Sequence, residues 1–248
     1  MIQNIFRGVR AYFGAFQLIS KLKLWRFFTI PITISVLTAS LIGFLAYSLS
    51  DNIGHYISNI WQWEFGKGAF EVISTFFSGL LILVVGLVLY KHVVMALSAP
   101  FMSPVSEKIE EYYKGKNHSH RKTSFQEQLV RGVRINVRNL TKELLLTIPI
   151  LLLSLIPIIG IFSTVILFLM QAYYAGFGNM DYTLERHFKY KESIEFVKKH
   201  KGLAIGNGIV FILFLLIPIV GVILVLPLSV TAATTETIKE IRVKELTE

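Results

Sequence analysis

The 248-residue sequence contains no cysteine and few charged residues. Without cysteine the chain forms no disulfide, no cysteine-ligated zinc site and no iron–sulfur cluster. Only 17% of the residues are charged, whereas a soluble domain carries about 25%. Hydrophobic residues make up 53% of the chain and come in long blocks, and the mean hydropathy is +0.58. These features indicate an integral, multi-pass, all-α membrane protein.

Motifs of the common enzyme classes are also missing. The chain has no HExxH, no GxxxxGK[ST], no GxSxG, and no GxGxxG in a strand–turn–helix setting. Its six histidines do not form a ligand cluster at helical spacing. We therefore predict that the protein is not an enzyme, with no catalytic residue, no metal site and no cofactor.

The formal net charge is +9, and the basic residues lie in the gaps between the apolar blocks. Beside a membrane such residues set topology and contact anionic lipids, so membrane lipids are expected partners and nucleic acid is not. The basic segments 101–142 and 186–201 are predicted to be cytoplasmic by the positive-inside rule. Both termini then also lie in the cytoplasm.

An amphipathic helix is predicted within residues 1–24, because apolar residues recur at helical spacing. The residues of this stripe are Ile2, Ile5, Phe6, Val9, Phe13 and Phe16. The helix lies either in the membrane interface or against the rest of the protein, and both alternatives remain open.

Two long transmembrane helices are predicted at 25–49 and 72–99. Each apolar run is long enough to cross a hydrocarbon core of about 30 Å. Lys91 and His92 fall near the end of the second helix, where we expect them to extend to the cytoplasmic interface. The 50–71 connection has one lysine and no arginine, and its Trp61 and Trp63 suit an interfacial belt.

Two helical hairpins are predicted at 144–177 and 203–233. Each contains a Pro-x-x-Gly turn, in LIPIIG at 155–160 and LIPIVG at 216–221. An arm of 13 residues spans about 20 Å, less than the bilayer core, which favours re-entrant hairpins that penetrate halfway. In this interpretation proline ends the first arm and glycine supplies unusual backbone angles. Two full crossings per unit remain the alternative.

Basic residues spaced by three and four place Arg131, Arg134 and Arg138 on one helix face, with valines on another. This helix either lies on anionic lipid or forms a cationic wall that concentrates an anionic solute. Glu107 and Glu110 either complement a helix dipole or pair with the basic face as part of an interior network.

Arg26 stands at the cytoplasmic start of the first long helix, between Trp25 and Phe27. It is either an interfacial anchor or a fixed positive charge beside a helix N-terminus, which is a favourable anion site.

The segment APFMSPVSEKIE at 99–110 resembles the hallmark of the CysZ family of bacterial sulfate permeases, which is related to the etoposide-induced membrane proteins. Other pieces of the chain match this family in order. They are Arg26-Phe27 with Pro31, the Pro157/Gly160 turn, Asp181-Tyr182, and Pro227 followed by Ala232-Ala233-Thr234.

The resemblance implies two long transmembrane helices with two hemi-penetrating hairpins, an oligomeric assembly, and sulfate movement into the cytoplasm for sulfur assimilation. It also implies an anion site at a Gly-x-Arg-Arg-Phe-like pattern. The matching run here is 23–27, which keeps the second arginine as Arg26 and lacks the glycine.

The sequence therefore favours a homo-oligomeric permease for sulfate or a similar oxyanion in the bacterial inner membrane. The predicted anion-binding residues are Arg26, Trp25 and Phe27. The predicted pathway or ion-pair network consists of Glu107, Glu110, Arg131, Arg134 and Arg138. The alternative is a non-transporting scaffold or bilayer-shaping protein.

Overall fold

The computed structural model describes residues 1–58, 67–115, 121–154, 156–217 and 219–247, and this part of the chain contains helices and no strands. The predicted interfacial belt at Trp61 and Trp63 lies outside these described residues. The helices are α1 (Ile2–Lys21), η1 (Leu24–Phe27), α2 (Thr29–Ser58), α3 (Lys67–Lys114), α4 (Phe125–Ser154), α5 (Pro157–His187), α6 (Tyr190–Lys199), α7 (Lys201–Leu215) and α8 (Val220–Thr247).

Four helical segments are long and apolar enough to cross a membrane: Thr29–Tyr56, Val85–Lys114, Gly160–His187 and Val220–Val243. Their burial differs strongly. Only 17% of the most apolar window in Thr29–Tyr56 is covered by the protein, compared with 78% in Val220–Val243. Apolar side chains left uncovered over a whole span suit lipid, not water. The all-helical, multi-pass membrane class predicted from the sequence is thus confirmed.

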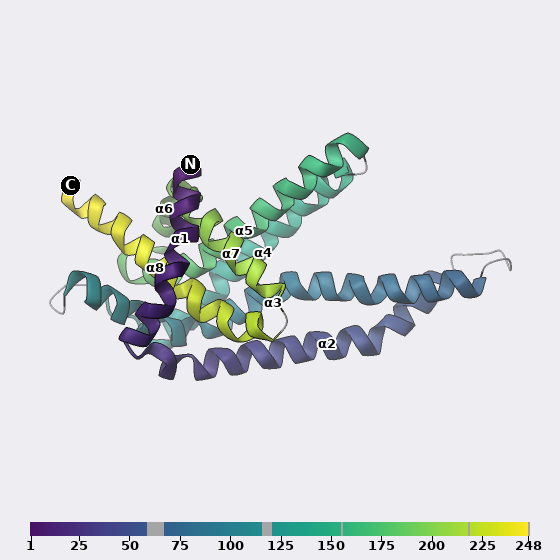
Figure 1. Ribbon diagram of the computed structural model, residues 1–248, viewed down its shortest axis with the longest axis horizontal. Helices are drawn as coiled ribbons and strands as arrows, with labels where there is room; N and C mark the ends of the chain where they lie inside the picture. Colours follow the sequence, from purple (N-terminus) through teal and green to yellow (C-terminus); the bar gives the residue numbers. More distant parts are fainter. Residues whose placement is uncertain (59–66, 116–120, 155, 218, 248) are drawn as a thin grey trace.

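Three helical hairpins organise the molecule (Figure 1). The pair α2 and α3 forms the longest arm, α4 and α5 form a second arm that diverges from it, and the α7–α8 hairpin packs between them. Both termini lie at the opposite end of the molecule from the tips of the two long arms. The short helix α7 has 15 residues, about 22 Å at 1.5 Å per residue. Half-penetration of these hairpins stays a prediction.

The backbone at the turns differs from the expected one. Pro157 opens α5 at its first helical turn, where proline's missing N–H costs little. Gly160 and Gly221 lie within α5 and α8, and the left-handed backbone angle falls on Ile219, with φ of 64°. The expectation that these glycines supply the unusual angles is therefore wrong. A Cβ on Gly221 would instead overlap the carbonyl oxygen of Phe214, so this glycine permits close approach of the two arms.

The described helical residues of the basic segment 101–142 belong to α3 and α4. Its first part continues α3 past Pro100 and Pro104, and its second part begins α4, which runs on into the apolar arm. Pro100 has no N–H, so the carbonyl of Ala96 loses its helical hydrogen bond. Helix α4 packs at this point through Gly132, where an added Cβ would lie 3.0 Å from the Ala96 oxygen.

Helix α1 has one covered face and one uncovered face. Ala15, Leu18 and Ile19 are buried, whereas Phe6 and Phe13 are 63% and 82% exposed. The covered face packs on α7 and α8. The helix thus packs on the protein while still presenting an apolar stripe to the outside, and a location in the interface stays a prediction.

Close contact between α1 and α7 depends on Gly8, and this gives a testable prediction. A Cβ at Gly8 would lie 2.7 Å from the Leu203 carbonyl oxygen and 2.9 Å from the Asn207 nitrogen, both rigid backbone atoms. We expect Gly8→Ala to destabilise the protein by about 1–3 kcal/mol through overpacking. The measurement is the thermal unfolding midpoint of the purified protein in detergent.

Gly14→Ala on the same helix is the matched control, because nothing lies within 4 Å of its added Cβ. Alanine favours helix over glycine by about 0.5–1 kcal/mol, so the midpoint is expected to stay or rise. Equal midpoints for the two variants would contradict the contact.

Candidate functional site

The predicted anion-binding residues lie on a single turn that leads into α2. Lys23 adopts a left-handed backbone conformation, with φ of 52°, and turns the chain into η1, which carries Trp25, Arg26 and Phe27. The fully buried side chains of Leu24 and Phe28 hold this turn in place. Arg26 is exposed, so its guanidinium is accessible to a solute at the start of α2.

Aromatic rings surround this arginine. The Arg26 guanidinium lies 4.9 Å from the centre of the Phe27 ring, and Lys108 Nζ approaches the same ring at 5.9 Å. Trp25 packs edge-on against Phe28 at 6.0 Å. Two cations from α3 and η1 therefore share one ring, which holds positive charge at the N-terminal end of α2.

Arg131 is the best-anchored member of the predicted basic face. It donates to both carboxylate oxygens of Asp181, at 3.0 and 2.9 Å, and also to the Phe188 carbonyl and the Ser193 hydroxyl. Burial lowers the pKa of Arg131, but the charge and hydrogen bonds of Asp181 more than offset this, so the pKa is raised. This bidentate pair fixes α4 against α5.

Arg134 and Arg138 occupy different surroundings along α4. Arg134 stacks over the ring of Tyr190 at 4.0 Å, and Arg138 lies 5.4 Å from the ring centre of Phe177. Arg138 also donates to Asn139 Oδ1 at 2.8 Å. The basic face is therefore not a row of solvated charges, because aromatic rings of α5 and α6 support it.

A polar pocket of about 260 Å³ opens beside this face. Its lining side chains are Arg121, Thr123, Glu127, Val130, Arg131, Arg134, Glu185, Lys189 and Tyr190. The backbone N–H of Ser124 and the charge of Arg121 lower the pKa of Glu127. Four cations against two carboxylates give the pocket a positive balance that suits an anion.

Glu110 is fully buried, and its ion pairs lead to α5. Arg186 Nη2 lies 3.1 Å from one carboxylate oxygen, His187 Nε2 lies 2.7 Å from the other, and Lys114 approaches at 3.7 Å. Arg186 also donates to Ser106 Oγ at 2.7 Å. Glu110 thus belongs to an interior network, in which these partners come from α5 and α3. Glu107 lies one helical turn before Glu110 on α3 and is half-buried.

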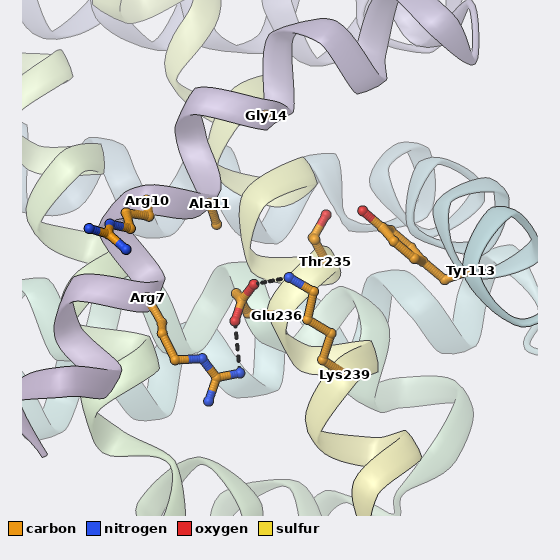
Figure 2. A pocket seen from close by; sticks show the side chains of 8 residues that line it. All are labelled: Arg7, Arg10, Ala11, Gly14, Tyr113, Thr235, Glu236 and Lys239. Atoms are coloured by element: carbon orange, nitrogen blue, oxygen red, sulfur yellow. Dashed lines mark hydrogen bonds and ion pairs between the residues drawn. The ribbon is translucent and has the colours of Figure 1, made fainter.

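A second polar pocket, of about 410 Å³, lies between α1, the end of α3 and α8 (Figure 2). Figure 2 shows Glu236 between Arg7 and Lys239, at 2.9 and 2.5 Å. Burial lowers the pKa of Arg7, but Glu240 and Glu236 more than offset this, so the pKa is raised. The pairs of Arg7 with Glu236 and Glu240 hold α1 on α8, and sequence reasoning missed them because these partners are more than 200 residues apart.

Sequence reasoning also missed a buried polar cluster between α3 and α4. Lys91 and His92 are each 3% exposed, and both contact Glu143, which is 1% exposed. The expectation that they extend to the interface is wrong, because a carboxylate inside the protein satisfies them. Within the described parts of the chain, no group of three His, Asp or Glu side chains is arranged to hold a metal ion.

The fold and the site define the class as a multi-pass helical membrane protein with positively charged polar sites. The family described as "Sulfate transporter CysZ/Etoposide-induced protein 2.4" matches residues 11–226, so the chain belongs to this family. A "Sulfate transporter CysZ" from Pseudomonas paraeruginosa is 27% identical over 229 residues, covering 90% of this chain and 91% of the relative. A protein of the same name from Pseudomonas aeruginosa matches equally. The family is one of transporters, not enzymes.

The Arg131–Asp181 pair gives the testable prediction of this site. Asp181→Asn leaves the guanidinium of Arg131 without its counter-charge in a largely buried position. Breaking such a pair costs about 3–5 kcal/mol when fully buried, and we expect a cost near the lower end because Arg131 retains 14% exposure. The measurement is the unfolding midpoint in detergent.

Glu127→Gln is the matched control, since it removes one carboxylate from an arginine pair that is about half exposed on both sides. We expect this variant to unfold at the wild-type midpoint. A midpoint for Asp181→Asn equal to that of the control would show that the pair does not join α4 to α5.

Proposed function

We propose that this protein is a permease for sulfate or a similar oxyanion, located in the bacterial inner membrane with both termini in the cytoplasm. The sulfate transporters that it matches over nine-tenths of its length support this assignment. The single structural observation that carries it is the orientation of α4. This helix turns polar residues inward and apolar residues outward.

The inward residues of α4 are Asn136, Asn139 and Glu143, which are at most 3% exposed. The outward residues include Val130, Val133 and Val137, which are 66%, 40% and 56% exposed. A water-soluble helix has the reverse arrangement. A helix with polar groups inside and apolar groups outside fits a polar path enclosed by the protein and surrounded by lipid.

The proposed path begins at Arg26 and the cations near it, which attract the anion at the start of α2. The polar pocket at Arg131 and Arg134 provides a second positive region on the same side of the apolar arms. Removing a divalent oxyanion from water is costly, so it must receive charge-assisted hydrogen bonds at each position. In this proposal the imported sulfate feeds sulfur assimilation, and the protein assembles as a homo-oligomer.

A scaffold or bilayer-shaping protein is the second candidate, and the exposed apolar stripe of α1 favours it. Phe6, Phe13 and Phe16 are at least 54% exposed and follow helical spacing. Such a stripe inserts shallowly into one leaflet. A scaffold requires no bound anion, and this distinguishes the two candidates.

The test is uptake of radiolabelled sulfate into proteoliposomes that hold the purified protein, with Arg26→Ala as the site variant. An arginine–oxyanion hydrogen bond is worth about 1.5–3 kcal/mol, so we expect uptake at low sulfate to fall about ten-fold or more. Related oxyanions should compete with the tracer.

Arg10→Ala is the matched control, because it removes an exposed arginine of α1 outside the proposed path. Uptake by this variant should equal that of the wild type. Absence of uptake above empty liposomes, from folded wild-type protein, would refute the permease assignment and favour the scaffold.

A further inference from the structure

Lys91, His92 and Glu143 form a compact charged cluster inside the helix bundle. Lys91 Nζ lies 2.6 Å from Glu143 Oε1, and His92 Nε2 lies 3.0 Å from Glu143 Oε2. Both oxygens of one carboxylate are therefore held by two nitrogen groups of α3. All three side chains are at least 97% buried.

The cluster lies deep along the apolar arms. Gly86 of α3 packs on Ile42 of α2, and Gly79 lies beside Ser50, where an added Cβ would be 3.5 Å away. Following this antiparallel register, Lys91 and His92 lie opposite the region of Leu37. That position lies about 12 Å inside the apolar span Thr29–Tyr56, and a charge there is expensive unless it serves a function.

Both ring nitrogens of His92 lie near side-chain oxygen atoms. Its Nδ1 lies 3.4 Å from Asn136 Oδ1, while the Asn136 amide nitrogen donates to the Gly132 carbonyl at 2.9 Å. This second bond fixes the Asn136 oxygen toward the ring, so both ring nitrogens face acceptors.

Asn139 adds a donor that has no use in the present arrangement. It lies on the same face of α4 as Asn136 and Glu143, one turn from each. Asn139 is 0% exposed, and its amide nitrogen has no hydrogen-bond partner among the described residues. A buried donor left without an acceptor costs about 1–3 kcal/mol, which marks a place for a further acceptor.

We propose that Lys91, His92 and Asn139 form an oxyanion-binding site inside the helix bundle, and that the Glu143 carboxylate occupies it when no substrate is bound. A carboxylate and a tetrahedral oxyanion both present paired, charged oxygens to N–H donors. The incoming anion displaces Glu143 and takes over its contacts with Lys91 and His92. This inference rests on the permease assignment and names the step at the centre of its path.

Simple helix adhesion explains the cluster less well. Replacing a buried ion pair by apolar residues of similar volume is often neutral or stabilising, so contact between α3 and α4 does not by itself require a charged cluster. Adhesion also leaves the unpartnered amide of Asn139 without a reason. Displacement of a built-in carboxylate accounts for both.

The test measures sulfate bound per chain and its Kd by equilibrium binding of the radiolabelled ion to the purified protein. Glu143→Gln removes the internal competitor, so we expect this site to bind sulfate about ten-fold more tightly than in the wild type. At sulfate concentrations too low to displace Glu143 in the wild type, this variant should therefore hold one additional sulfate per chain. Lys91→Gln/Glu143→Gln removes the main cation as well and should lose this gain. Glu195→Gln, which removes an exposed carboxylate of α6, should bind as the wild type does.

A folded Glu143→Gln protein with wild-type stoichiometry and Kd would overturn the inference. Should this variant not fold, the charge-free double variant decides through uptake: a fall of about ten-fold supports the site, and wild-type uptake refutes it. If the wild type neither binds nor transports sulfate, the permease assignment fails. An extra sulfate in Glu143→Gln would still support the site itself.

Discussion

Ion pairs between α3, α4 and α5 are the interactions on which the arrangement of the long helices depends. A charge between apolar helices costs several kcal/mol unless a partner lies within reach. Three buried acidic residues of this region each meet a basic residue of a neighbouring helix. The pairs are Glu110–Arg186, Asp181–Arg131 and Glu143–Lys91. These partners determine which face of each helix turns inward, and the remaining apolar faces turn outward.

Close backbone packing makes these pairs possible. Gly132 brings α4 against the freed carbonyl of Ala96, and this contact places Asn136 next to His92. A larger residue at Gly132 would hold the two helices apart and separate the charged groups. The proline in α3 and the polar interior are thus connected, because α4 approaches α3 at the carbonyl that Pro100 leaves without a helical hydrogen bond.

Much of the fold was predictable from the sequence, because long apolar runs in a chain with 17% charged residues have few alternatives to membrane helices. Breaks between helices also fall at the two Pro-x-x-Gly repeats, between α4 and α5 and between α7 and α8. The turn geometry was not predicted, because the left-handed residue is Ile219 and both glycines lie inside helices. Helix boundaries in 101–142 were also missed, since the change from apolar to basic residues does not interrupt the helical backbone.

The site was only partly predictable. The spacing of Arg131, Arg134 and Arg138 showed a basic face, but not that their partners come from α5 and α6. Lys91 and Glu143 are 52 residues apart, so no local pattern connects them. A pattern in α4 could have predicted this polar interior. Asn136, Asn139 and Glu143 recur at helical spacing on the face opposite a row of valines.

The central claim is that α4 encloses a polar path and shows its valines to lipid. Because the native chain has no cysteine, single cysteines introduced at Asn139 and Val137 can be labelled in membranes without other changes. A small, charged, water-soluble thiol reagent should modify the Asn139 position and be blocked by sulfate, whereas the Val137 position should react only with a lipid-soluble maleimide. Rapid modification at Val137 by the charged reagent, with an inert Asn139 position, would contradict this orientation of α4.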